Sequence, residues 1–69
     1  MKLRIKGNSI RLRLTKTDVN NLAAAGIVEE HTNFGSTALS YALQTTAEFP
    51  HPQATFMNNR ICVSIPHDF

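Results

Sequence analysis

The basic side chains gather at the start of the chain, and their spacing is the pattern with the clearest chemical meaning. Six of the seven lysines and arginines lie in the first sixteen positions, and no acidic residue precedes Asp18. Five of the six alternate with apolar residues on both sides of a turn, which predicts that they share one face of a two-stranded ribbon. These candidate binding residues are Lys2, Arg4, Lys6, Arg11 and Arg13.

This face allows three interpretations. Like charges that face each other on paired strands destabilise the ribbon, so they need compensation. Acids from neighbouring strands can supply it, and Glu29 or Glu30 is expected to neutralise an arginine of the ribbon. The long side chains can also keep their heads in water. The third source is an anionic partner, either a phosphate backbone or an acidic protein surface. The sequence alone favours the first two interpretations, so nucleic acid is an allowed partner but not the favoured one.

The sequence gives little support for a metal site or for a reactive thiol. The three histidines, His31, His51 and His67, lack the close paired spacing of zinc ligands. Cys62 is the only cysteine and lies in an apolar stretch, where a thiol behaves as a small hydrophobic side chain. We therefore predict no metal site and no cofactor.

Catalytic patterns are equally scarce. Glu29 and Glu30 are adjacent, so on a strand their carboxylates point to opposite faces and cannot flank one bond. The chain contains no G-x-x-x-x-G-K-[ST], G-x-G-x-x-G or G-x-S-x-G motif. No catalytic residue is predicted, and a binding or interaction module is favoured over an enzyme.

The elements that carry these residues follow from alternation and capping signals. Residues 2–6 and 10–14 predict a hairpin around Gly7-Asn8-Ser9. Thr15 as N-cap, Asp18 and a terminal Gly26 predict a helix over residues 16–25. Four strands are expected over 27–34, 37–45, 54–57 and 60–65, and the last two form a second hairpin around the turn Asn58-Asn59. The fold class is therefore α+β, a mostly antiparallel sheet in β-β-α-β-β-β-β order with one short helix.

One domain over residues 1–69 accounts for the length. The end, Pro66-His67-Asp68-Phe69, is typical of the start of another element and indicates a domain cut at its C-terminus. The predicted core consists of Leu3, Ile5, Ile10, Leu12, Leu14, Val19, Leu22, Leu39, Tyr41, Phe56, Ile61, Val63 and Ile65.

A chain of this size has a small core and cannot form an internal disulfide, so we expect stabilisation by a second copy, as a homodimer. A protein partner is the other expectation for the module. The unpaired cysteine indicates a reducing, cytoplasmic compartment. No apolar run approaches the ~18 residues that span a bilayer, so no membrane association is predicted.

Two resemblances rest on the opening residues. The start K-x-R-I-K-G-N-S-I-R-x-R-L-T, followed by V-N-N-L-A-A-A-G-I-V-E-E, resembles short uncharacterised bacterial proteins that form a domain-of-unknown-function family. That resemblance implies a shared fold and no activity.

The second resemblance covers residues 1–26 only. Gly7-Asn8-Ser9 and the basic strand after it are similar to the G-N-S-x-x-V-R-I-P stretch of AbrB/MazE-type swapped-hairpin DNA-binding proteins. It implies DNA contacts by Arg4, Lys6, Arg11 and Arg13. The chain departs from the pattern, however, because Lys6 replaces the usual Trp and Thr15 the usual Pro.

Overall fold

Over the residues that the structure describes, the fold combines one helix with six strands, as expected for the α+β class. The computed structural model describes residues 1–48 and 50–67. The elements are β1 (Lys2–Lys6), β2 (Ser9–Arg13), α1 (Lys16–Ala25), β3 (Ile27–Asn33), β4 (Ala38–Thr46), β5 (Gln53–Met57) and β6 (Arg60–Pro66). The predicted C-terminal extension concerns Asp68 and Phe69, which lie outside the described residues.

The strands form two sheets, and the prediction of one mostly antiparallel sheet is wrong. β1 and β2 pair only with each other, while the larger sheet has the order β3-β4-β6-β5. This larger sheet is mixed, because β4 and β6 run parallel. After β4 the chain forms β5 and then returns as β6, which lies between β4 and β5. This order places β6, the strand with the most buried residues, between β4 and β5, and buried residues occur on both of its faces.

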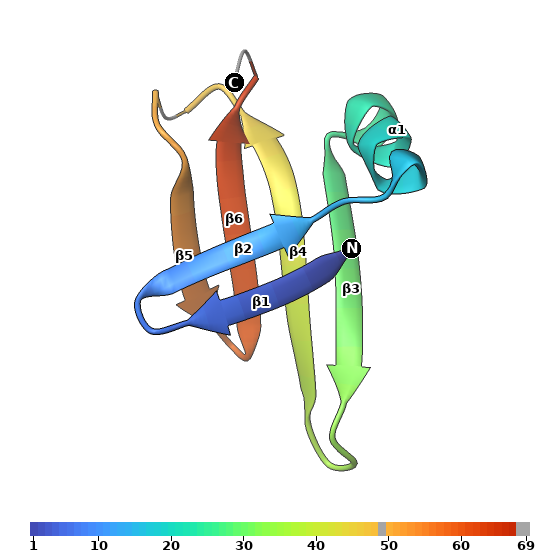
Figure 1. Ribbon diagram of the computed structural model, residues 1–69, viewed down its shortest axis with the longest axis vertical. Helices are drawn as coiled ribbons and strands as arrows, with labels where there is room; N and C mark the ends of the chain where they lie inside the picture. The colour runs from blue at the N-terminus through green and yellow to red at the C-terminus, as the bar shows by residue number, and fades with distance from the viewer. Residues whose placement is uncertain (49, 68–69) are drawn as a thin grey trace.

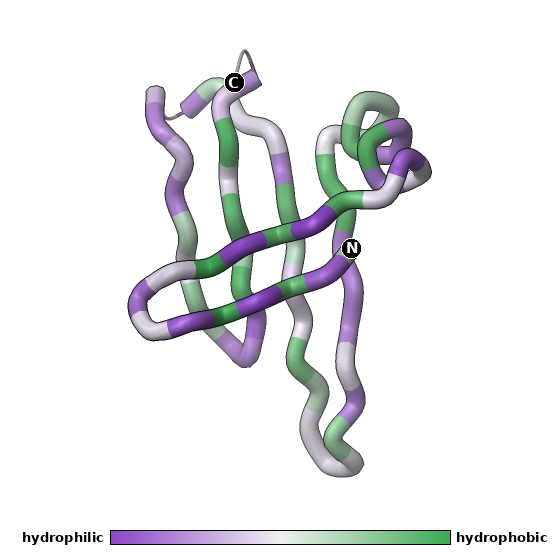
Figure 2. Tube along the Cα trace, viewed as in Figure 1, coloured by the Kyte–Doolittle hydropathy of each residue, from purple (hydrophilic) through white to green (hydrophobic). Residues whose placement is uncertain are grey.

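The β1–β2 hairpin crosses one face of the larger sheet at a steep angle (Figure 1). Apolar and polar residues alternate along both of its strands (Figure 2). Leu3 pairs with Leu12 and Ile5 with Ile10 on the face toward the sheet. Arg11 and Arg13 are exposed, so the predicted division of the hairpin into an apolar and a basic face is confirmed, although the second strand covers Ser9–Arg13 and not residues 10–14.

Helix α1 begins and ends at the predicted residues. The Asp18 backbone N–H donates to Thr15 Oγ1 (3.1 Å), and the Thr15 N–H donates to Asp18 Oδ2 (2.9 Å). This reciprocal capping box satisfies two donors that the helix itself cannot use. At the other end Gly26 adopts φ 80°, and its N–H bonds to the Leu22 carbonyl at 2.8 Å. The helix, which packs beside β3, is too short to span a membrane, and no other helix occurs in the described ranges.

The core is smaller than predicted and lies deeper in the sheet. Of the predicted core residues only Ile61 is buried, and eight are half-buried: Leu3, Leu12, Leu14, Leu22, Leu39, Tyr41, Val63 and Ile65. Four predicted core residues are exposed instead: Ile5 (57%), Ile10 (42%), Val19 (50%) and Phe56 (68%). The remaining buried apolar residues are Val28, Ala42, Leu43 and Cys62. The prediction failed because alternation identifies the apolar face of a strand without showing how much of that face another element covers.

Candidate functional site

The five predicted binding residues lie together on the outer face of the β1–β2 hairpin. Gly7, at φ 54°, begins a two-residue turn, and Ser9 Oγ donates to the Lys6 carbonyl at 2.8 Å. A glycine with positive φ at the first turn position is typical of a type II′ hairpin, whose twist matches that of the strands. The resulting register sets one residue of β1 opposite each residue of β2. We call Lys2, Arg4, Lys6, Arg11 and Arg13 together the basic face.

Like charges meet directly on the basic face. Lys2 is paired with Arg13, and Arg4 with Arg11, so four cations form two adjacent cross-strand pairs. Their side chains line a shallow hollow of 190 Å³, and Arg4, Lys6, Ser9 and Arg11 line a second one of 200 Å³. All five basic residues are exposed. Ser9 is a member of this face that the sequence reasoning missed, although its pairing with Lys6 follows from the same alternation.

The acidic residues that could have compensated these charges are bonded elsewhere. Glu29 Oε2 accepts from Arg60 Nε at 2.7 Å. Glu30 pairs with the N-terminal ammonium group of Met1 and accepts a hydrogen bond from Tyr41 Oη at 3.3 Å. Asp18 also pairs with the Met1 ammonium group, at 2.9 Å. The expectation that Glu29 or Glu30 neutralises an arginine of the ribbon is therefore wrong.

No ion pair involves the basic face over residues 1–48 and 50–67. The reason is geometric. The hairpin crosses one face of the larger sheet (Figure 1), its apolar residues line the groove toward that sheet, and its cations therefore take the opposite face. Burial of the apolar side thus leaves the charges facing solvent.

The pKa values separate the bonded acids from this open face. The Thr15 backbone N–H, together with the Met1 ammonium group, lowers the pKa of Asp18 to about 2. Hydrogen bonding from Arg60 lowers the pKa of Glu29, and that same bond raises the pKa of Arg60. Bonds to Glu30 and Asp18 raise the pKa of the Met1 amine. Desolvation and then the nearby Glu30 raise the pKa of Tyr41.

The other candidate groups do not converge on a site. Cys62 is buried in β6, and His31 Nδ1 lies 2.9 Å from Ser40 Oγ on an exposed part of the sheet. His51 and His67 are exposed. Among the residues that the structure describes, no three histidine, cysteine or acidic side chains gather closely enough to hold a metal ion. Glu29 and Glu30 take opposite faces of β3, since they pair with Ala42 and Tyr41 in turn.

Comparison with known proteins identifies a family and no characterised relative. No curated protein and no solved structure matches the chain. The resemblance to AbrB/MazE-type proteins thus rests on the hairpin alone, which here lies over a four-stranded sheet of its own chain. A family of unknown function, DUF7009, matches residues 1–69, in agreement with the resemblance of the opening residues. The chain therefore belongs to the DUF7009 family.

Proposed function

We propose that this protein is a binding module that holds a phosphate-rich polyanion, duplex nucleic acid in particular, against the basic face. One observation carries the proposal: five cations share an exposed face, two pairs of them directly opposed, and no acid of the described chain lies within ion-pair distance. Opposed like charges destabilise a free hairpin. An anion that bridges them therefore stabilises the bound state in two ways, because it removes this repulsion and accepts charge-assisted hydrogen bonds.

The density of the charges favours phosphate over scattered carboxylates. Same-face neighbours along a strand lie about 6.8 Å apart, and paired strands about 4.8 Å apart. The basic face therefore concentrates its cations within a patch of order 15 Å, and duplex DNA offers about one negative charge per 1.7 Å of its axis. Three of the five cations are arginines, whose planar fork matches phosphate oxygens in a bidentate manner. The two hollows give such oxygens places to sit between the side chains.

Binding of this kind reads charge rather than base sequence. None of the residues in β1 and β2 is aromatic, so the ribbon lacks the stacking platforms typical of single-strand binders. Contacts from lysine and arginine to phosphates position a protein on a duplex without specifying bases. We therefore expect weak sequence preference. An AbrB/MazE-like role would use the same side chains and add sequence specificity.

Two features support a binding role over catalysis. The two acidic side chains of β3, Glu29 and Glu30, are held in ion pairs on opposite faces of that strand. The one thiol, Cys62, is buried and so has no direct access to a substrate. That unpaired thiol also supports assignment to a reducing, cytoplasmic compartment.

The test is the salt dependence of binding to a short duplex of mixed sequence, measured by fluorescence anisotropy. Affinity should fall with a log–log slope of about −0.9 per phosphate neutralised. Changing Arg11→Ala and Arg13→Ala together should weaken binding uniformly across duplex sequences and flatten the slope by up to about two units. Both side chains face outward, so the fold should be retained.

Lys16→Ala is the control, because Lys16 is the one other basic side chain among the first sixteen residues and lies in helix α1, outside the basic face. Its affinity and slope should match those of the unchanged protein. The proposal fails if duplex affinity at physiological salt is no tighter than ~10⁻⁴ M, the generic level for a basic surface. It also fails if the Lys16 change weakens binding as much as the double change.

A further inference from the structure

The two edges of the larger sheet differ in how they are protected. β3 carries Glu29, Glu30 and His31, and charged side chains on an edge strand discourage pairing with another chain. β5, with the sequence Gln-Ala-Thr-Phe-Met, has neither charge nor proline, and all five of its residues are exposed. β5 therefore presents unpaired backbone groups with none of the usual safeguards against a further strand.

The tip of the β1–β2 hairpin reaches past this edge (Figure 1). Ile5 and Ile10, near the tip, remain 57% and 42% exposed because the sheet ends beneath them. With Ala54, Thr55, Phe56 and Ile61 they line an apolar groove of 370 Å³. The hairpin thus extends beyond β5, and no strand of the described residues lies beneath its outer part.

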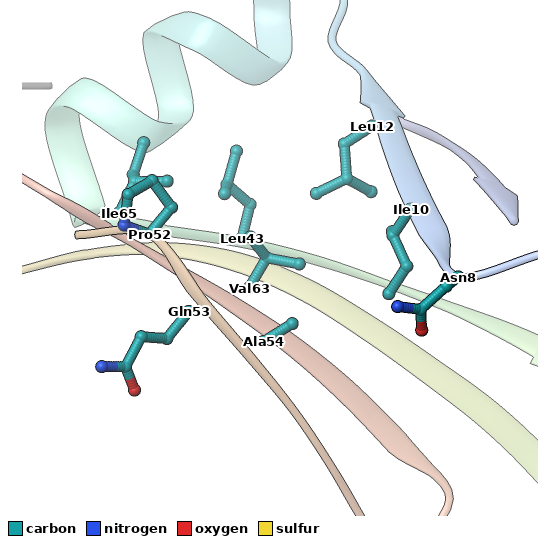
Figure 3. Close-up of a pocket in the computed structure, with 9 residues that line it drawn as sticks. All are labelled: Asn8, Ile10, Leu12, Leu43, Pro52, Gln53, Ala54, Val63 and Ile65. Atoms are coloured by element: carbon teal, nitrogen blue, oxygen red, sulfur yellow. The ribbon is translucent and has the colours of Figure 1, made fainter.

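A second groove continues the first along β5. It has a volume of 430 Å³, and Ile10, Leu12, Leu43, Val63 and Ile65 converge on it from the two sheets (Figure 3). Asn8, Pro52, Gln53 and Ala54 complete its lining. The space between hairpin and β5 is therefore mostly apolar and open at the free edge.

We propose that β5 pairs antiparallel with β5 of a second copy of this chain, about a two-fold axis at Thr55. This register pairs all five residues of the strand: Thr55 faces its own copy, Gln53 faces Met57, and Ala54 faces Phe56. Directly opposed residues of an antiparallel pair share a face. Each Phe56 then lies over the small Ala54 of the other chain, beneath the other chain's overhanging hairpin.

The pattern of β5 favours a second copy over a foreign strand. The match between large Phe56 and small Ala54 is self-complementary, since one two-fold axis satisfies it on both sides, as closed dimers require. An uncharged strand also meets its own copy without repulsion. Ile5, Ile10, Phe56 and Met57 are each at least 42% exposed. Complete burial of these four residues on both chains would remove at most roughly 1,000 Å² of accessible surface, which is the lower limit for a specific interface.

The axis of such a pair is perpendicular to the sheet. Both hairpins then cover the same side of one eight-stranded sheet, and the two basic faces point to the same side. The dimer would present a doubled basic surface, although the inference itself does not depend on the proposed function. The two can be distinguished, because salt weakens phosphate binding while it screens the mutual repulsion of the two hairpins and so favours the dimer.

The test is Phe56→Lys, with Phe34→Lys as a matched control. Both phenylalanines are 68% exposed, but Phe34 lies at the β3–β4 turn, far from β5 in Figure 1. Sedimentation at micromolar concentration should give twice 7.7 kDa for the unchanged protein and the control. Phe56→Lys should weaken dimerisation by at least about tenfold, because the change occurs twice in a two-fold interface. Circular dichroism should show an unchanged fold for both variants, since both side chains are exposed in the single chain.

A cross-link tests the register independently of affinity. Thr55→Cys, in a Cys62→Ala background because Thr55 and Cys62 are direct cross-strand partners, should form an intermolecular disulfide upon mild oxidation. Met57→Cys in that background should not, since Met57 faces Gln53 of the other chain. A monomer at all accessible concentrations overturns the proposal. So does a dimer that Phe56→Lys leaves intact, or a cross-link through position 57 instead of 55.

Discussion

The β3 side of the molecule and the N-terminal hairpin differ in whether their charged groups have partners of opposite charge. Near β3, Glu29 is bonded to Arg60, and Asp18 and Glu30 share the Met1 ammonium group. On the hairpin, the five cations of the basic face have no acidic partner among the described residues, and the isoleucines near the tip are partly uncovered. The acidic groups near β3 are therefore paired within the chain, whereas the hairpin leaves both cations and apolar side chains exposed to solvent. This difference teaches where to look for partners: stability resides in the sheet and β3 side, and binding at the hairpin and β5.

The largest effect should come from the centre of the sheet. Leu43 in β4 is 5% exposed and faces the hairpin, so Leu43→Ala should lower the free energy of unfolding by about 2–5 kcal/mol. Phe34→Ala, at a 68% exposed position, should change it by no more than about 0.5 kcal/mol. Chemical denaturation of both variants measures the difference. Equal losses would mean that the centre of the sheet contributes no more to stability than an exposed turn.

A smaller effect is expected at the start of helix α1, which packs beside β3. Thr15→Ala removes the hydroxyl that accepts the Asp18 N–H, which should cost about 1 kcal/mol of the free energy of unfolding. Thr17→Ala is the matched control, because Thr17 is exposed inside the same helix and alanine has the higher helix propensity. The control should be neutral or slightly stabilising. A loss at Thr17 equal to that at Thr15 would mean that the cap contributes nothing.

Much of the local structure could be predicted from the sequence, because each local signal involves neighbours along the chain. Alternation placed the basic residues and the apolar residues of the hairpin on opposite faces. The Thr15, Asp18 and Gly26 signals fixed both ends of the helix. The second hairpin was also expected around Asn58 and Asn59, and both adopt positive φ (54° and 60°) as a two-residue turn requires.

The arrangement of these pieces could not be predicted in the same way. Alternation tells which face of a strand is apolar but not which strand lies beside it, so the parallel pairing of β4 with β6 left no local signal. The bond between Glu29 and Arg60 joins residues 31 positions apart and depends on that strand order. The exposure of Ile5 and Ile10 depends on where the sheet ends beneath the hairpin. The absence of charge in β5 was the one signal in the sequence that could have identified the open edge.

The most direct test of the account compares one arginine from each side. Arg60→Gln breaks the ion pair with Glu29, whereas Arg11→Gln removes one of two directly opposed arginines on the basic face. The thermal unfolding midpoint of each variant should be measured at low ionic strength, where surface electrostatics are least screened. We expect Arg60→Gln to lower the midpoint by a few degrees at most, and Arg11→Gln to leave it unchanged or raise it. If Arg11→Gln lowers the midpoint as much as Arg60→Gln does, the basic face is satisfied within the chain and the central claim is wrong.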